Sequence, residues 1–243
     1  MSIEADTQTD TPQIWAVVPA AGVGSRMAME TPKQYLEIAG RTVLAHTLDA
    51  LAGHDRIIGV VVAIRSEDNI WSDLNYRHQK LIRAVEGGSE RIHSVLNALE
   101  WLSVQSETGN NDWVMVHDAA RPCVSSEEID GLIEAALGGG AGAILGQPIN
   151  DTLKKVNQEA DRILETVDRN LYWRAQTPQL FPLQILLDAL RAAVRTGNLA
   201  TDESAAMEAM GFQPVIVPGQ PSNIKITTLE DLQLANYYLG NLK

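Results

Sequence analysis

Cysteine is nearly absent from this sequence of 243 residues: Cys123 stands alone, so no disulfide can form within the chain. The five histidines are scattered, and no cysteine and histidine cluster has the spacing of a zinc site. Long apolar runs are missing too, because nowhere do about 18 apolar residues follow one another as a membrane helix requires. The first residues are acidic and polar, unlike a signal peptide. These absences predict a cytoplasmic protein that does not span a membrane.

Basic side chains are also scarce. Lys and Arg number 19 against 31 Asp and Glu, which gives a formal net charge of -12 and a pI near 4.8. Such a charge repels the phosphate backbone of nucleic acids and anionic membrane surfaces. A small phosphorylated substrate remains compatible, since a few cations in one cleft dominate the field over a Debye length of about 8 Å. We therefore expect no nucleic acid partner and leave a small anionic ligand open.

The remaining composition is that of a globular protein, with 45% hydrophobic and 21% charged residues. We expect a disordered tail over residues 1–12 and a single domain over 13–243. Apolar runs rich in β-branched residues alternate with segments of helical spacing, which is typical of a doubly wound, mostly parallel α/β sheet. The expected strands are 14–18, 57–64, 81–85, 113–117, 141–149, 215–217 and 224–226. The expected helices are 43–51, 66–76, 89–102, 125–137, 183–195, 201–210 and a last one from Thr228 to Gly240.

A different pattern interrupts this alternation between Asp151 and Val167. Two short alternating stretches, TLKKV and ILETV, flank the polar segment NQEAD. This pattern predicts an inserted β-hairpin arm at about residues 150–170. An exposed hairpin is marginally stable alone, so we expect it to pack against a partner.

A glycine-rich loop, PAAGVGSRM, directly follows the first strand, where open α/β sheets bind ligands. Gly22 and Gly24 allow backbone N–H groups to approach phosphate oxygens, and Arg26 and Lys33 add positive charge. A dinucleotide fingerprint needs Gly or Ala where Met27 stands, and a Walker A motif is absent. The alternative is that the glycines only form a tight turn and that both cations are solvated.

Asp118 ends an apolar strand in the segment VHDAARP. A carboxylate is a suitable ligand for Mg²⁺, which bridges phosphates in nucleotidyl transfer. The alternative is an N-cap or turn residue. We predict that Asp118 contacts the metal or the substrate, because Arg121 follows three residues later and Pro122 stiffens the segment.

The segment from Pro19 to Gly40, PAAGxGxRM followed by PKQYLxIxG, resembles the signature of sugar and polyol nucleotidyltransferases. Within that group, Pro32 to Tyr35 narrow the resemblance to the cytidylyltransferases of 2-C-methyl-D-erythritol 4-phosphate. Further segments look like this family in the expected order: GGSERIHSVLNAL, VHDAARPCV, DTLKKV, TVDRN, AQTPQLF, TDESAAMEAMG and NIKITTLEDL. The resemblance implies a Rossmann-like nucleotidyltransferase fold. It also implies transfer of a cytidylyl group from CTP, in the non-mevalonate route to isoprenoid precursors.

The resemblance also implies roles for individual residues. The nucleotide-binding set is Ala20, Ala21, Gly22, Gly24, Gly88, Ser94 and Ala119, of which Ala119 also borders the polyol phosphate. The polyol-binding set is Asp118, Arg121, Thr152, Thr177 and Thr201, and the catalytic set is Arg26, Lys33, Arg169 and Lys225. In the family the hairpin arm embraces a second subunit and delivers the residues matching Thr152 and Arg169 into its site. A homodimer with shared active sites is therefore implied.

Three positions have a second interpretation or depart from the family. Lys225 alternates with two isoleucines, which predicts a strand with Lys225 on its other face, where a lysine could simply be solvated. Thr201 precedes a helix and is expected to be its N-cap, a role compatible with substrate contact. Ser89 stands where the family commonly has aspartate, so a nucleotide contact by that carboxylate is weaker, replaced or absent here.

The expected reaction is an in-line attack by a phosphate oxygen of the polyol phosphate on the α-phosphorus of CTP, with pyrophosphate leaving. Mg²⁺ is the expected cofactor. Two alternatives stay open: a ribitol 5-phosphate cytidylyltransferase, which differs only in its polyol pocket, and a catalytically silent nucleotide-binding protein. Retention of Arg26, Lys33, Asp118 and Lys225 argues against the silent protein.

Overall fold

The structure is a computed structural model that describes residues 12–22, 31–105, 107–109, 111–197 and 200–241. Residues 1–11 of the expected tail therefore lie outside the described residues, as do Gly24, Arg26 and Met27 of the glycine-rich loop. Among the described residues, no helix combines the length and apolar character needed to cross a bilayer.

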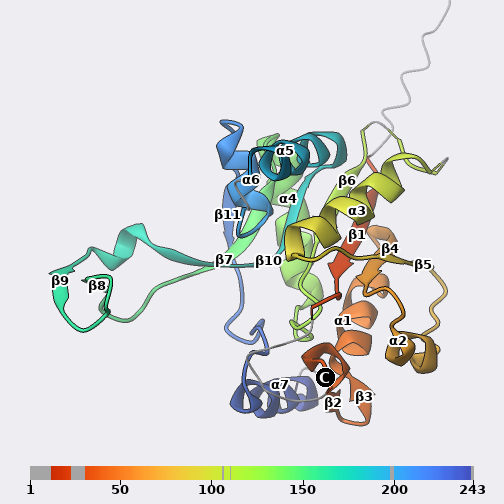
Figure 1. Cartoon of the computed structure of the whole chain (residues 1–243), viewed down its shortest axis with the longest axis horizontal. Helices are drawn as coiled ribbons and strands as arrows, with labels where there is room; N and C mark the ends of the chain where they lie inside the picture. Colours follow the sequence, from red (N-terminus) through yellow and green to blue (C-terminus); the bar gives the residue numbers. More distant parts are fainter. Residues whose placement is uncertain (1–11, 23–30, 106, 110, 198–199, 242–243) are drawn as a thin grey trace, which may run out of the picture.

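A seven-stranded sheet forms the centre of the molecule (Figure 1). Its order is β11-β7-β10-β6-β1-β4-β5. The strands are β1 (Ile14–Pro19), β4 (Ile57–Ile64), β5 (Leu81–Glu86), β6 (Trp113–Val116), β7 (Ala143–Pro148), β10 (Trp173–Pro182) and β11 (Val215–Pro218). Only β10 among these strands runs antiparallel to its neighbours, β6 and β7. The mostly parallel α/β sheet predicted from the sequence is confirmed.

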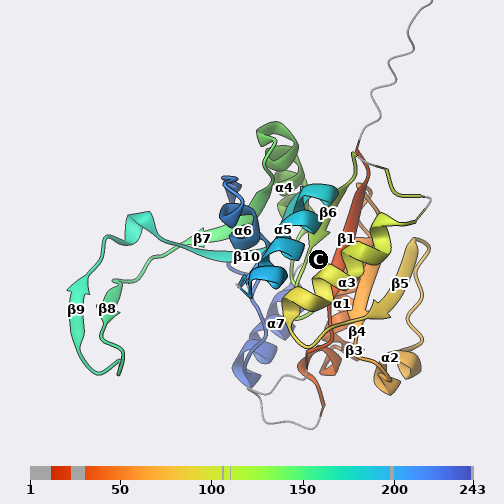
Figure 2. The ribbon, with the colours of Figure 1, turned by 45° about the horizontal axis from the view of Figure 1, so that its top comes forward.

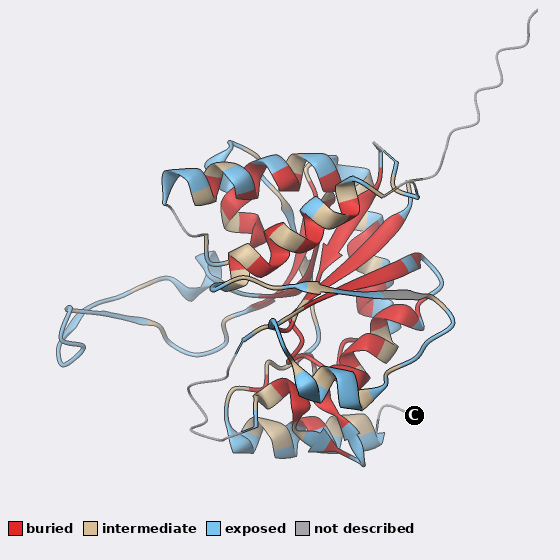
Figure 3. Cartoon of the chain, turned by 45° about the vertical axis from the view of Figure 1, so that its right-hand side comes forward, coloured by how far each residue is buried: buried red, intermediate tan, exposed pale blue. Residues whose placement is uncertain are grey.

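Helices cover both faces of this sheet (Figure 2). On one face, α1 (Val43–Ala52) and α4 (Ser126–Gly139) pack onto the alternate residues Ile14, Ala16 and Val18 of β1. On the other, α3 (Arg91–Ser103), α5 (Leu183–Thr196) and α6 (Glu203–Ala209) pack onto Trp15 and Val17. The continuous apolar run of β1 is explained by this double coverage, since both faces of the strand are buried (Figure 3).

Smaller elements complete the domain near one end of the sheet. They are the 3-10 helix η2 (Lys33–Tyr35), the strands β2 (Glu37–Ile38) and β3 (Arg41–Thr42), and the helices α2 (Asn69–Leu74) and α7 (Leu229–Asn241). A third apolar cluster joins Ile38 of β2, Ile226 and Ala235 of α7. It fastens the C-terminal segment beneath the loop that follows β6, because Ala120 and Cys123 belong to the same cluster.

Local capping explains several helix boundaries. Ser125 and Glu128 form a reciprocal capping box at the start of α4, and Gly140 ends that helix with a φ of 74°. The helix expected over 66–76 is shorter, because Asp68 caps the N–H of Trp71 and Asn75 turns left-handed with a φ of 44°. The sequence suggested Thr201 as the N-cap of α6, and this prediction was wrong. Asp202 takes that position and accepts from the N–H of Ala205 at 3.0 Å.

Two strand expectations were wrong. Residues 224–226 form no strand, because Ile226 bonds to the carbonyl of Ala120 in a loop contact and buries its side chain in the third cluster. Conversely, β10 was not expected. Its two prolines, Pro178 and Pro182, and a register shift between Ala175 and Gln179 hide the alternation of a strand.

The predicted hairpin is present and projects far from the body between β7 and β10 (Figure 1). Strand β8 (Lys154–Val156) pairs antiparallel with β9 (Ile163–Thr166), and the 3-10 helix η3 (Arg169–Leu171) follows. The large apolar residues exposed along this arm are Val156, Ile163, Leu164, Leu171, Tyr172 and Trp173. A single chain thus leaves an apolar surface in water, and packing of the arm against a partner stays a prediction.

Candidate active site

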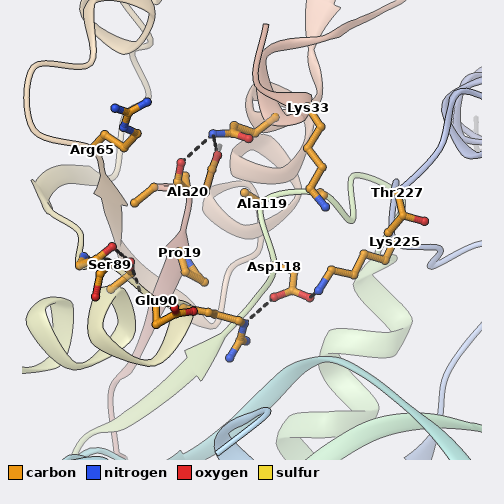
Figure 4. A pocket seen from close by; sticks show the side chains of 17 residues that line it. Pro19, Ala20, Lys33, Arg65, Ser89, Glu90, Asp118, Ala119, Lys225 and Thr227 are labelled. Carbon is orange, nitrogen blue, oxygen red and sulfur yellow. Dashed lines mark hydrogen bonds and ion pairs between the residues drawn. The ribbon is translucent and has the colours of Figure 1, made fainter. Parts of the chain in front are cut away.

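A cavity of about 550 Å³ opens at the carboxyl ends of β1, β4 and β6 (Figure 4). The chain reverses its direction of travel across the sheet here, since β4 flanks β1 on one side and β6 on the other. Loops diverge at such a point and leave a crevice between them, where α/β proteins bind ligands. Of the predicted residues, those lining this cavity are Ala20, Ala21, Gly22, Lys33, Gly88, Ser94, Asp118, Ala119 and Lys225.

One wall of the cavity is built from small residues in two loops that touch. A side chain at Gly87 would place its Cβ only 2.5 Å from the Cβ of Ala21, so close approach of the loops requires glycine there. Gln34 holds the first loop open, because its amide donates to the carbonyls of Ala20 at 2.8 Å and Gly22 at 3.0 Å. Gln34 was not singled out from the sequence, although it lies within the PKQYL segment.

The second loop of this wall precedes α3. The hydroxyl of Ser94 accepts a hydrogen bond from the N–H of Gly88 at 3.1 Å, so Ser94 shapes the loop from within the helix. Ser89 lines the cavity and is exposed, with its hydroxyl 3.2 Å from Nδ1 of His93. The uncharged side chain of Ser89 thus faces the cavity directly.

Two lysines reach the cavity from separate segments (Figure 4). Lys33 stands at the start of η2 and donates to the carbonyl of Ile226 at 3.1 Å. Lys225 extends along the opposite side to the carboxylate of Asp118, with Nζ 2.8 Å from Oδ2. Lys225 thus lines the cavity and pairs with Asp118, while its side chain remains 36% exposed.

Asp118 is buried and lies at the centre of a cluster of charges. Its Oδ1 accepts from Nε of Arg91 at 2.9 Å, and Nε of Arg121 lies 3.7 Å from Oδ2. Burial alone would raise the pKa of Asp118, but the nearby charges of Arg91 and Lys225 outweigh it and hold that pKa well below its usual range. Asp118 is therefore a permanent anion surrounded by cations.

This surrounding decides whether Asp118 suits a metal. Both of its oxygens already contact cations, Oδ1 through Arg91 and Oδ2 through Lys225. Across the part of the chain that the structure describes, no three His, Cys, Asp or Glu side chains are arranged to hold a metal ion. The described donor set does not fit a magnesium ion held by protein side chains.

Arg121 and Thr177 lie behind Asp118 rather than in the cavity wall. Nη1 of Arg121 donates to the carbonyl of Asn223 at 2.7 Å, and the hydroxyl of Thr177 accepts from the N–H of Asp118 at 3.0 Å. Nε2 of His117 faces the carbonyl of Arg121 at 3.0 Å, so this nitrogen carries the hydrogen and Nδ1 accepts from Thr177. The hydroxyl of Thr177 thus accepts from the backbone of Asp118 and donates to the ring of His117.

Besides Arg121 and Thr177, three predicted residues among those described do not line this cavity within one chain. Thr152 and Arg169 belong to the projecting arm, where Arg169 donates to the carbonyl of Asn150. Thr201 is exposed just before α6. Arg26 and Gly24 lie outside the described residues.

Sequence reasoning missed a bridge formed by Arg91 and Glu203. The guanidinium of Arg91 bonds both carboxylate oxygens of Glu203, at 2.7 and 2.9 Å, in addition to Asp118. Both residues stood inside recognised segments, GGSER and TDES, as charged residues at helix starts. Only their burial in the fold distinguishes them from solvated charges, because Glu203 is 1% exposed. Arg65 and Thr227 also line the cavity and were not predicted.

Comparison with known proteins places this site in a family. The sequence model of 2-C-methyl-D-erythritol 4-phosphate cytidylyltransferase matches residues 14–241. The protein of that name from Vibrio vulnificus strain CMCP6 is 49% identical over 228 residues, which cover 94% of this chain and 95% of that one. The corresponding protein from Photobacterium profundum is 46% identical over 235 residues, 96% of this chain and 98% of that one.

Solved structures agree. The crystal structure of the Francisella tularensis 2-C-methyl-D-erythritol 4-phosphate cytidylyltransferase superposes with a TM-score of 0.79 at 37% identity and covers 93% of this chain and 99% of that one. The Thermus thermophilus enzyme of the same name gives a TM-score of 0.75 at 31% identity, over 94% and 99% of the two chains. With sequence, fold and cavity in agreement over nearly the whole length, the chain belongs to the family of 2-C-methyl-D-erythritol 4-phosphate cytidylyltransferases.

Proposed function

We propose that this chain transfers a cytidylyl group from CTP to 2-C-methyl-D-erythritol 4-phosphate and releases pyrophosphate, the activity for which its family is named. The product is 4-diphosphocytidyl-2-C-methyl-D-erythritol. One observation carries the proposal: a backbone wall of small residues, Lys33 and the Asp118–Lys225 pair face one cavity at the carboxyl edge of the sheet. Such a cavity suits two phosphorylated ligands in a protein whose net charge of -12 would otherwise repel them.

The proposed reaction needs no covalent intermediate between enzyme and substrate. The attacking phosphate oxygen is ionised at neutral pH, so no general base is required, and the protein must align two anions and stabilise the charge of the transition state. Lys33 reaches the cavity beside the loop of Ala20 to Gly22, where it would bind the triphosphate. Lys225, on the other side, would hold the polyol phosphate, and Arg121, which lies behind Asp118, would support it from outside the cavity wall. Arg26 would join Lys33 on the triphosphate.

Nucleotide recognition falls to the wall of small residues. Ala20, Ala21, Gly22 and Gly88 line the cavity and place no bulky side chain in it. Ser94 and Ala119 border the same space. These residues would bind the phosphates, ribose and cytosine through N–H and carbonyl groups, as backbone-lined loops do.

The proposal includes a homodimer that shares its active sites. The exposed apolar side chains of the arm support it, since a hairpin of this size gains stability only by packing. Twofold pairing would bring Thr152 and Arg169 of each arm toward the other chain's cavity. A cytoplasmic location belongs to the same proposal, supported by a buried free thiol at Cys123.

Turnover of purified protein tests the reaction. With CTP, Mg²⁺ and 2-C-methyl-D-erythritol 4-phosphate, pyrophosphate release is expected, and ribitol 5-phosphate should compete poorly. If the protein prefers ribitol 5-phosphate, the proposed substrate is wrong, but the proposed cytidylyl transfer stands. The need for Mg²⁺ expected from the sequence stays a prediction. Leaving Mg²⁺ out of the same assay tests it, and activity should then be lost.

A further inference from the structure

Arg91 holds an unusual position for a residue at the start of a helix. It opens α3 and places its guanidinium between two buried carboxylates that come from different segments, Glu203 of α6 and Asp118 after β6. Bonds to Glu203 use both terminal nitrogens, and Nε is left for Asp118. A planar guanidinium can make this two-sided contact, whereas an ammonium group cannot reproduce its geometry.

The contacts continue to Lys225 as a chain of alternating charges. Glu203 faces Arg91, Arg91 faces Asp118, and Asp118 faces Lys225, with every link at 2.9 Å or less. Glu203 does not line the cavity, but the other three residues do. The cavity cation Lys225 is therefore connected through Asp118 to a charge pair whose far end lies outside the cavity.

This arrangement solves a problem that a phosphate-binding lysine would otherwise meet. Lys225 must leave Asp118, at least in part, to bind an anionic phosphate, and the bare carboxylate would then repel the ligand. Arg91 remains bonded to Asp118 Oδ1 and compensates its charge while Lys225 turns to the phosphate. Glu203 in turn holds the guanidinium of Arg91 at the cavity wall, because it bonds both terminal nitrogens.

We propose that Arg91 is a positioning residue: it orients and neutralises Asp118 so that Lys225 is available to the phosphate of the second substrate. The substrate assignment rests on the proposed function, whereas the charge relation among Arg91, Asp118 and Lys225 does not. Arg91 acts through Asp118 and Lys225, and Glu203 only holds Arg91 in place.

Two variants separate this role from a merely structural bridge. Glu203→Gln keeps Arg91 on Asp118, whereas Arg91→Gln combined with Glu203→Gln removes the arginine and leaves no buried charge unpaired. The single variant should keep kcat/KM for the polyol phosphate within about threefold, and the double variant should raise its KM about tenfold or more with KM for CTP nearly unchanged. Equal damage by both variants would reduce Arg91 to a link between α3 and α6. Arg91→Lys in the Glu203→Gln background should restore part of the loss, since the lysine can then serve Asp118 alone.

The Asp118→Asn background tests whether Arg91 acts through Asp118. With the carboxylate gone, removing Arg91 should have little further effect, so the two losses are strongly non-additive. Full additivity would mean that Arg91 touches the substrate directly and would overturn the proposal.

A measurement without turnover keeps this proposal separate from the proposed function. Acetylation of Lys225 by acetic anhydride, followed by peptide mass spectrometry and normalised to the exposed Lys155, reports how tightly Asp118 holds Lys225. Loss of Arg91 leaves Asp118 a stronger anion for Lys225, so Lys225 should react severalfold more slowly in the double variant, at native rate in Glu203→Gln and faster in Asp118→Asn. Equal rates in the native and double-variant proteins would overturn the role of Arg91, even if the native protein proved inactive toward the family's substrates.

Discussion

Lys33 reaches the cavity from η2, and its Nζ contacts the carbonyl of Ile226 across from the loop after β1. Under the proposed function, a cation in this place would act on the triphosphate most strongly when charge moves onto the leaving pyrophosphate. Lys33→Ala should therefore lower kcat by a factor of about 10² to 10³. Steady-state kinetics with CTP varied checks this. Lys155→Ala, which removes an exposed lysine from the arm, is the control, and a near-normal kcat in Lys33→Ala would refute the role.

His117 provides a second test at the scale of one residue. Burial lowers its pKa to about 4, below the ordinary 6.5, because no water stabilises the charged ring between Arg121 and Thr177. The unfolded chain therefore binds a proton that the folded chain does not between these two values. The stability that the neutral ring contributes is complete above pH 6.5 and is lost as the pH falls toward 4.

The measurement is urea unfolding at two pH values. Between pH 7 and pH 5 the native protein should lose about 2 kcal/mol more than a His117→Asn variant, which has no titrating ring. Asn can keep the bond to the carbonyl of Arg121, so the variant is expected to fold. Parallel losses in the two proteins would show that His117 is protonated in the folded state.

At the scale of an element, the proposed pairing of the arm with a second copy can be tested. Leu171 is 78% exposed on the arm, and Val104 is equally exposed after α3 on the body. If the arm pairs with a second copy, Leu171→Asp should convert a dimer into monomers and remove most activity, because it buries a charge in the interface. Val104→Asp should remain dimeric and active. Sedimentation of both variants checks this, and a monomeric native protein would contradict the pairing.

Subunit exchange then tests which site the arm serves. Arg169→Ala and Lys225→Ala chains are each expected to be inactive alone. If Arg169 acts across the interface, a mixed dimer contains one site with both defects and one with neither, so mixing should restore activity toward half per dimer. Absence of recovery despite proven exchange would assign Arg169 to its own chain.

At the scale of the whole molecule, the cavity joins loops from both ends of the chain, from Ala20 to Lys225. A ligand that bridges these loops binds the folded state but not the unfolded state. CTP at 100 times its Kd should therefore add about 2.7 kcal/mol to the free energy of unfolding and raise the Tm. Mg²⁺ or EDTA without nucleotide should leave the Tm unchanged, because the described side chains offer no metal cluster. A clear shift with Mg²⁺ alone would reveal a protein-held site completed by other residues.

The fold was largely predictable from local pattern. Runs such as Ile14 to Val18 are buried on both sides, so their hydrophobicity is continuous and identifies a central strand without tertiary information. The hairpin between Asp151 and Val167 was predicted from its two short stretches of alternating apolar and polar residues, and β8 and β9 pair as expected. By contrast, β10 was missed, because Pro178 and a register shift break its pattern and only pairing with β6 and β7 makes it a strand.

The sequence by itself determined the chemistry available: a small-residue loop after the first strand, and Lys33, Asp118 and Lys225 in recognisable segments. Tertiary structure alone decided which of these groups meet. It turned Lys225 from a residue of an expected strand into the partner of Asp118, and it joined Arg91 to Glu203 although 112 positions separate them in the chain. The physical reason is that burial and pairing of charge depend on distances between loops, and no local periodicity encodes those distances.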